Sequence, residues 1–287
     1  MIYLILSILS STGIFILFRT LKSFKINTLQ VIVMNYITAC FTGFLIYDGE
    51  ISLNAITSSG WFYGAVALGF LFIAIFNVIA LTSQRNGLSV ASVASKMSVV
   101  IPVIFGLYVY KESMGAQKLI GIVLALLAVY LSSLKPKSDA KLGKALLLPI
   151  LLFFGSGVID TSIKYLETTY VAENGIPVFS GTIFGFAGFI GIAIIVYKML
   201  FQNMKFELKS IPFGIALGLI NYCSIYFLLK ALQFEGLESS TIFTVNNVAI
   251  VAFSTLVGLV LFKERISKIN WMGIGLALVS ITLITLA

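Results

Sequence analysis

Charged residues are scarce in this sequence, and histidine is absent. Asp, Glu, Lys and Arg together make up 10% of the 287 residues, whereas soluble domains carry about 25%. Hydrophobic residues make up 59% of the chain, and 24 of them are Phe. This composition excludes an ordinary soluble domain and predicts a multi-pass membrane protein that lies in a lipid bilayer.

The residue patterns that enzymes and metal sites need are also missing. There is no histidine, and the two cysteines, Cys40 and Cys223, lie inside apolar runs, so neither a zinc site nor a disulfide can be drawn. The sequence has no Gly-x-x-x-x-Gly-Lys-[Ser/Thr] loop that would bind ATP phosphates. We therefore expect no enzymatic activity, no cofactor, no metal and no nucleic-acid partner.

Long apolar runs make up most of the chain. Each is about 17 to 25 residues long, which suits a helix crossing roughly 30 Å of hydrocarbon and is too long for a barrel strand. We predict an all-α membrane protein with ten transmembrane helices. The predicted helices cover residues 2–18, 28–47, 60–81, 89–110, 117–134, 145–165, 177–197, 211–232, 239–262 and 270–286.

One stretch occurs twice in the chain. Residues 106–126 align with residues 258–278 without a gap, and nine of the 21 positions are identical. Both copies contain the end of an apolar helix, a Lys-Glu pair (111–112 and 263–264) and then a second apolar helix. A repeat of such long period indicates two related halves. We predict that each Lys-Glu pair fixes its corner and caps the helix that follows.

The repeat divides the chain into two five-helix halves, residues 1–134 and 145–287, joined by a polar linker, residues 135–144. Because five is odd, the halves insert with opposite orientations, as in the inverted repeats of secondary transporters. The odd-numbered connections carry 14 basic residues and the even-numbered ones carry four. Lys and Arg gather on the cytoplasmic side. We therefore expect a bacterial inner-membrane protein with a cytoplasmic linker and both termini periplasmic.

These features resemble the drug/metabolite transporter superfamily, EamA type. The likeness rests on two five-helix repeats, on Pro102 in the fourth helix and on Gly-x-x-x-x-[Gly/Lys]-Glu at the ends of the fourth and ninth. This sequence departs from the family pattern by Lys before each Glu and by Ser254 opposite Pro102. The resemblance implies transport of small metabolites, often amino acids or their relatives, through a cavity lined by the first, third, fourth, sixth, eighth and ninth helices. It also implies a basic residue closing the first and sixth helices, where Arg19 and Lys164 lie.

Two ionisable residues lie well inside predicted helices, where charge is costly unless it faces a partner or a wet cavity. Lys96 lies roughly 14 Å into the fourth helix. It either pairs with a carboxylate or helix carbonyls, or binds an anionic group of the substrate. Asp160 in the sixth helix either pairs with Lys164 one turn later or accepts a proton and couples it to transport.

Neutral polar residues within the helices are candidates for lining a substrate cavity. Each can instead hydrogen-bond across helices, an interaction worth about 1 kcal/mol or less in membranes. Residues 246 and 247 point about 100° apart, so a single neighbouring helix is poorly placed to satisfy both. The candidates are Asn77, Asn221, Tyr222, Tyr226, Asn246 and Asn247.

Pro102 interrupts the hydrogen bonding of the fourth helix, because it has no N–H to donate to the Ser98 carbonyl. We predict a kink about one and a half turns beyond Lys96. The kink is either a hinge for alternating access or a static bend.

Small residues recur at four-residue spacing in several predicted helices. This spacing predicts close helix–helix packing, above all between the fifth and tenth helices, which both end a repeat. The residues are Gly121, Ala125, Gly181, Gly185, Gly273 and Ala277.

Together these patterns predict a secondary transporter, an exporter or importer that works by alternating access. Its substrate would be a small polar or amphipathic metabolite such as an amino acid or a related organic anion. A proton or a counter-substrate is the candidate coupling partner, and the protein is expected to act as a monomer. The alternatives are a flippase-like carrier of a lipid-linked group and a membrane protein that does not transport.

Overall fold

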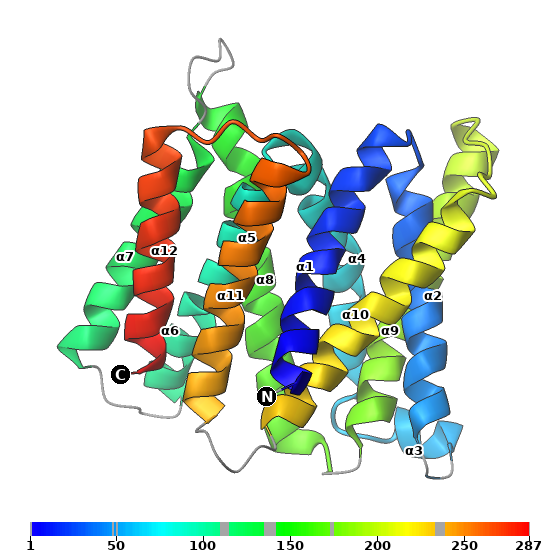
Figure 1. The fold of residues 1–287 in the computed structure, drawn as a ribbon. Helices are drawn as coiled ribbons and strands as arrows, with labels where there is room; N and C mark the ends of the chain where they lie inside the picture. The colour runs from blue at the N-terminus through cyan, green and yellow to red at the C-terminus, as the bar shows by residue number, and fades with distance from the viewer. Residues whose placement is uncertain are drawn as a thin grey trace. The chain divides into compact units, whose positions relative to one another are not determined.

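The computed structural model describes residues 2–47, 49, 51–109, 115–134, 142–172, 175–232 and 239–286. These residues form helices joined by short connections, and no strand occurs among them (Figure 1). The all-helical prediction is therefore confirmed. In chain order the helices are α1 (Ile2–Ser23), α2 (Thr28–Ile46), α3 (Leu53–Thr57), α4 (Phe62–Arg85), α5 (Leu88–Met97), α6 (Val100–Val109), α7 (Ala116–Ser133), α8 (Leu142–Tyr170), α9 (Ile176–Phe201), α10 (Ser210–Leu232), α11 (Ser239–Val260) and α12 (Lys268–Thr285).

Seven helical segments are long and apolar enough to cross a membrane, by length and composition. They are Ile2–Ser23, Thr28–Ile46, Phe62–Arg85, Leu88–Phe105, Leu146–Glu167, Ile176–Phe201 and Ser210–Leu228. Three shorter apolar helices, Leu119–Ser132, Val245–Val260 and Lys268–Ile284, coincide with the fifth, ninth and tenth predicted helices. These segments identify a multi-pass membrane protein.

Several helices differ from the predicted ranges, and α1 and α4 extend beyond their predicted ends to Ser23 and Arg85. The short helix α3 lies in the second connection, where the sequence predicts none, and the Ser52 hydroxyl caps it by accepting the Ala55 N–H. Helix α8 begins at Leu142, inside the predicted linker, and residues 135–141 lie outside the described ones. The predicted boundary followed the polar composition of residues 135–144, but lysine is a good helix former and does not end a helix.

The fourth predicted helix is broken into α5 and α6 at Ser98 and Val99. Because Pro102 cannot donate to the Ser98 carbonyl, that carbonyl accepts the Ile101 N–H at 2.9 Å in a tighter turn. The interruption thus begins directly after Met97, nearer to Lys96 than the predicted one and a half turns. The reason is that proline disrupts the helix at the carbonyl one turn before its own position.

The chain forms two compact units. The first unit contains Met1–Thr20, Val78–Val158 and Cys223–Ala287, and the second unit contains Leu21–Asn77 and Ile159–Tyr222. Each unit takes segments from both halves of the repeat, so compact packing mixes the halves.

In the first unit, α7 packs extensively against α12. Ala125 and Ala277 are fully buried, and a Cβ atom on Gly273 would lie 2.5 Å from the Ser132 nitrogen. The Asn270 side-chain amide donates to the carbonyls of Leu131, Ser132 and Leu134 at 2.7–2.9 Å, which satisfies the end of α7. The predicted packing of the fifth and tenth helices through small residues is confirmed.

In the second unit, α2 packs against α9 in the same manner. A Cβ atom on Gly43 would lie 3.2 Å from the Gly181 Cα atom, so the two backbones come close there. Tyr36 is fully buried beside Phe184, with ring centres 6.0 Å apart. Its hydroxyl donates to the Phe72 carbonyl at 2.7 Å, so no polar atom of this ring is left unsatisfied in the core.

The closest helix pairs share one property. Helices α2 and α9 are the second helices of the two halves, α5 and α11 are the fourth, and α7 and α12 are the fifth. Each pair packs together within one unit. Several helices therefore contact their own counterparts in the repeat.

The α7–α12 contact predicts a difference between two glycines on one helix. Gly273→Ala should lower the free energy of unfolding by about 1–3 kcal/mol, because the added methyl group meets the α7 backbone. Gly275→Ala is the matched control, since a Cβ atom there has nothing within 4 Å and alanine favours the helix. Thermal unfolding in detergent measures both, and equal midpoints would contradict the close contact.

Candidate functional site

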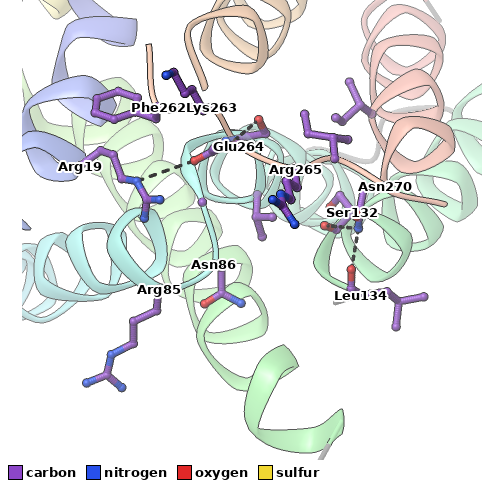
Figure 2. Close-up of a pocket in the computed structure, with 15 residues that line it drawn as sticks. Arg19, Arg85, Asn86, Ser132, Leu134, Phe262, Lys263, Glu264, Arg265 and Asn270 are labelled. Carbon is purple, nitrogen blue, oxygen red and sulfur yellow. Dashed lines mark hydrogen bonds and ion pairs between the residues drawn. The ribbon is translucent and has the colours of Figure 1, made fainter. Parts of the chain in front are cut away.

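A cavity of about 360 Å³ lies in the first unit, where four chain segments meet (Figure 2). These segments are the end of α1, the turn between α4 and α5, the end of α7 and the loop between α11 and α12. All four belong to odd-numbered connections of the predicted topology. The charged residues of the lining are Arg19, Arg85, Lys263, Glu264 and Arg265.

The Glu264 carboxylate lies beside this cavity and binds the first turn of α5. Its Oε1 atom accepts the Leu88 N–H at 2.6 Å. Its Oε2 atom accepts the Ser89 hydroxyl at 3.2 Å and, at 3.4 Å, the Ser89 N–H. A carboxylate at a helix N-terminus satisfies unpaired backbone donors and interacts favourably with the helix dipole. Glu264 therefore caps α5, a helix from the other half of the repeat.

Two glycines lie against this carboxylate, and their lack of side chains makes room for it. Gly87 has φ of +116°, which side-chain-bearing residues rarely adopt, and a Cβ atom there would lie 3.0 Å from Oε1 of Glu264. A Cβ atom on Gly258 would lie 2.7 Å from Oε2. The Gly258 carbonyl also accepts the Glu264 N–H at 2.9 Å, and Lys263 takes the left-handed conformation with φ of +49°. The repeated Gly-x-x-x-x-Lys-Glu motif thus ends α11 as a left-handed cap and turns the carboxylate back beside the helix.

The predicted role of this Lys-Glu pair therefore needs a correction. The following helix, α12, is capped by Ser267 and Asn270, whose side chains each accept the other's backbone N–H at 3.2 Å. Glu264 caps α5 instead, because the left-handed turn at Lys263 directs its side chain away from α12. The first-half pair, residues 111–112, lies outside the described residues.

Arg19, near the end of α1, joins Glu264 to the end of α4. Its Nη1 atom donates to the carbonyls of Ser83 and Gln84 at 3.0 and 2.7 Å, in the turn where helix carbonyls lack backbone donors. Its Nε atom lies 3.9 Å from Oε1 of Glu264, and its guanidinium lies 6.0 Å from the Phe262 ring centre. The Arg19 and Glu264 side chains are 23% and 9% exposed. This pair thus holds three segments of the first unit together.

A protein of Haemophilus influenzae matches nearly the whole chain. An uncharacterized protein of Haemophilus influenzae is 30% identical over 284 residues, which are 97% of this chain and 95% of the relative. The chain belongs to the same family as that protein. No protein-family profile matches this member of the family. A crystal structure aligns with 98% of this chain and 97% of its own, with a TM-score of 0.58 at 15% identity, which shows a shared fold.

In this family member, the first unit holds several of the predicted site residues. Lys96 is half-buried in the last turn of α5, and Pro102 lies in the first turn of α6. Asn246 is buried in α11 and accepts the Ser7 hydroxyl of α1 at 3.2 Å. Its neighbour Asn247 is half-buried. Asn246 therefore joins two helices, the structural role weighed above.

Tyr226 lies on the exposed part of α10 in the first unit, with 38% of its surface exposed. The Lys230 ammonium lies 6.0 Å from its ring centre, an arrangement worth about 0.5–1 kcal/mol at an exposed site. The Phe227 ring lies 5.7 Å from it. The tyrosine is thus packed among side chains of its own helix.

The second unit holds the remaining predicted residues. Asn221 is buried in α10 and donates to the Asn35 side-chain oxygen of α2 at 3.3 Å. Asn77 is half-buried and donates to a carbonyl one turn earlier in α4 at 2.7 Å. Tyr222 is half-buried, and Asp160 is exposed on α8. Asn221, like Asn246, joins two helices.

Arg85 and Arg265 line the cavity but stand out in the sequence only as members of the basic connections. The signal that points to them is the 14-to-4 excess of basic residues in the odd-numbered connections. The repeat marks the Lys-Glu pair beside Arg265. Neither signal identifies α5 as the element that Glu264 contacts, because that contact joins segments far apart in the sequence.

The Glu264 contacts predict a stability loss. Glu264→Gln should lower the free energy of unfolding by about 2–4 kcal/mol, because the amide NH₂ faces backbone donors and Arg19 loses its carboxylate. Glu207→Gln is the matched control in the second unit. Glu207 accepts the Asn27 N–H at 3.0 Å, and a glutamine oxygen can still accept it, so the loss should stay below about 1 kcal/mol. Thermal unfolding in detergent compares them, and equal losses would refute the special role of Glu264.

Proposed function

We propose that this protein is a ten-helix secondary transporter of a small polar or amphipathic metabolite. The observation that carries the proposal is the packing of α2 with α9, of α5 with α11 and of α7 with α12, each helix against its counterpart. Helices near a pseudo-two-fold axis between two inverted halves meet their own counterparts, and inverted halves are a recurring plan of secondary transporters. The EamA-type resemblance of the sequence supports the same function.

The proposed topology has ten spans, formed by the seven long apolar segments and the three shorter ones. In the first unit, four odd-numbered connections meet around the cavity. In the second unit, the first and seventh connections meet, because the Gln30 side chain donates to the Lys205 carbonyl at 2.8 Å and accepts the Glu207 N–H at 2.8 Å. Within each unit, the odd-numbered connections, which carry most of the basic residues, thus contact one another. This supports their placement on the cytoplasmic face of a bacterial inner membrane.

This topology predicts that the C-terminus is periplasmic. Alkaline phosphatase fused after Ala287 should be active, because it folds only in the periplasm, and green fluorescent protein at the same point should be dark. The same reporters inserted at Lys137 in the linker should give the opposite pattern. A fluorescent, phosphatase-negative C-terminus would reverse the proposed orientation.

Alternating access requires each end of the transporter to open in turn. In the first unit, Glu264 joins α5, α1 and the α11–α12 loop, so these contacts would part when that end opens. The break at Ser98 and Val99 divides α5 from α6 and supplies a hinge beside Lys96. Pro102 maintains that break, since it cannot restore the missing hydrogen bond.

The proposed substrate carries an anionic group, such as the carboxylate of an amino acid, that binds Lys96. The counterpart of Lys96 in the second half is Val248, so the charge belongs to one half alone. A packing role inherited from the repeat tends to appear in both halves, whereas a substrate needs one charge at one place. Asn247, half-buried in the same unit as Lys96, is proposed to contact the polar part of the substrate. In the second unit, Asp160 is proposed to accept a coupling proton, and Tyr222 stays a sequence-based prediction.

Purified protein in liposomes tests this proposal through flux of candidate amino acids and organic anions. Lys96→Met should weaken substrate binding roughly 10- to 150-fold, the effect of losing a charged hydrogen bond. Its thermal midpoint should stay close to that of the unmodified protein, because methionine replaces a costly charge with an apolar chain of similar length. Lys96→Arg should transport in part, since the planar guanidinium does not replace a compact ammonium.

Three outcomes would overturn parts of this scheme. Full transport by Lys96→Met would remove Lys96 from the substrate site. Joint loss of stability and transport would assign Lys96 to a structural ion pair. A lack of flux for every soluble candidate, together with movement of a labelled lipid between leaflets, would favour the flippase alternative.

A further inference from the structure

We propose that the cavity of the first unit is a binding site for a phosphate ester, either an anionic phospholipid headgroup or a soluble organophosphate. This site goes beyond the proposed transport pathway and does not depend on it. The cavity lies at the end where α1, α4, α7 and α11 finish, and its volume of about 360 Å³ falls within the range of small-ligand pockets.

The charge of the lining favours an anion. Four cationic side chains line the cavity against one carboxylate, so four positive charges minus one leave an excess of three. The carboxylate of Glu264 is already engaged, because it accepts the donors of α5 and pairs with Arg19. Concave surfaces lined by one sign of charge focus the electrostatic potential and concentrate ions of the opposite sign.

Lys263 and Arg265 are the side chains proposed to bind the phosphate group. Both side chains are exposed, and among the described residues neither forms an ion pair. Figure 2 shows Arg265 between Glu264 and Ser132. Their loop is fixed on both sides, by the bonds of Glu264 and by the Ser267 cap of α12. An arginine held on a fixed loop is suited to phosphate, whose oxygens match the guanidinium fork.

Part of the remaining wall of the cavity is apolar. Val90, Leu134, Phe262, Ile266 and Ile274 add apolar surface beside the cations. A phospholipid presents this combination, with a phosphate next to a glycerol backbone and acyl chains. Basic pockets at the ends of transmembrane helices are suited to anionic headgroups, and the apolar wall favours the lipid over the soluble ester.

The test uses the full-length protein in a neutral detergent. Short-chain phosphatidylglycerol, short-chain phosphatidylcholine and glycerol phosphate are titrated separately, with thermal unfolding and native mass spectrometry as readouts. We expect phosphatidylglycerol to bind at least about tenfold more tightly than phosphatidylcholine, as the gain from a charged hydrogen bond. Its binding should weaken as salt rises, because exposed charges are screened.

Paired charge variants assign the binding to the cavity. The double variant Lys263→Gln with Arg265→Gln should lower phosphatidylglycerol affinity about tenfold or more. The matched control, Lys205→Gln with Lys209→Gln, removes two exposed charges from another odd-numbered connection and should keep full affinity. The unfolding midpoints without ligand check that both double variants fold. If the variant of Lys263 and Arg265 does not fold, the phosphatidylglycerol affinity of the single variant Arg265→Gln is measured instead.

The outcomes distinguish the two candidate ligands, an anionic phospholipid and a soluble organophosphate. Glycerol phosphate that binds through the same residues and competes with the lipid would identify a soluble organophosphate as the ligand. Selective binding of phosphatidylglycerol alone would identify the lipid. Equal binding of both lipids without binding of glycerol phosphate, or equal losses in both double variants, would overturn the site.

Discussion

A nearly buried carboxylate, Glu264, governs the structure at one end of the first unit. Its oxygens accept hydrogen bonds from the first turn of α5 and lie beside Arg19 of α1, with 9% of its side chain exposed. Removing a carboxylate from water is costly unless its lone pairs are satisfied and its charge is balanced. The dipole and free N–H groups of α5 and the guanidinium of Arg19 meet both requirements. This contact joins the first turn of α5 to the loop after α11 and to α1.

The same contact explains why the repeated motif keeps its particular residues. Glycine suits position 258 because a Cβ atom there would lie only 2.7 Å from Oε2 of Glu264. The residue before Glu264 takes a left-handed conformation, which glycine adopts readily and Lys263 adopts here at an energetic cost. The EamA-type pattern that the sequence resembles has glycine there, and lysine adds a positive charge to this corner. That added charge is one of the cations around the cavity.

Much of the fold follows from patterns that the sequence displays locally. Apolar runs placed the seven segments long enough to cross a membrane and the three shorter apolar helices, because their lengths reflect the bilayer. Pro102 predicted a kink in the fourth helix, and the interruption lies one turn earlier, at the carbonyl to which proline cannot donate. The small residues Gly121 and Gly273 predicted the α7–α12 contact. The short helix α3 was missed, because five residues leave no measurable periodicity.

The candidate site was less predictable, because it depends on contacts between distant segments. Charge counting indicated that basic connections share one side, but it could not show that Glu264 reaches the N-terminus of α5. The sequence likewise left two roles open for Asn221 and Asn246: lining a substrate cavity, or forming a hydrogen bond to another helix. The structure shows the hydrogen bonds. Local patterns identify which residues are polar and buried. Only the packing identifies their partners.

Helix α5 connects the two regions to which function is assigned in the first unit. Its first turn is held by Glu264 beside the cavity, and its last turn carries Lys96. The helix is ten residues long and spans about 15 Å, and it packs against α7, α11 and α12. It ends at the break before Pro102, so its hydrogen-bond ladder is separate from that of α6. A change in the bonds of Glu264 would therefore reach, through this one helix, Lys96, the residue proposed to bind the anionic group of the substrate.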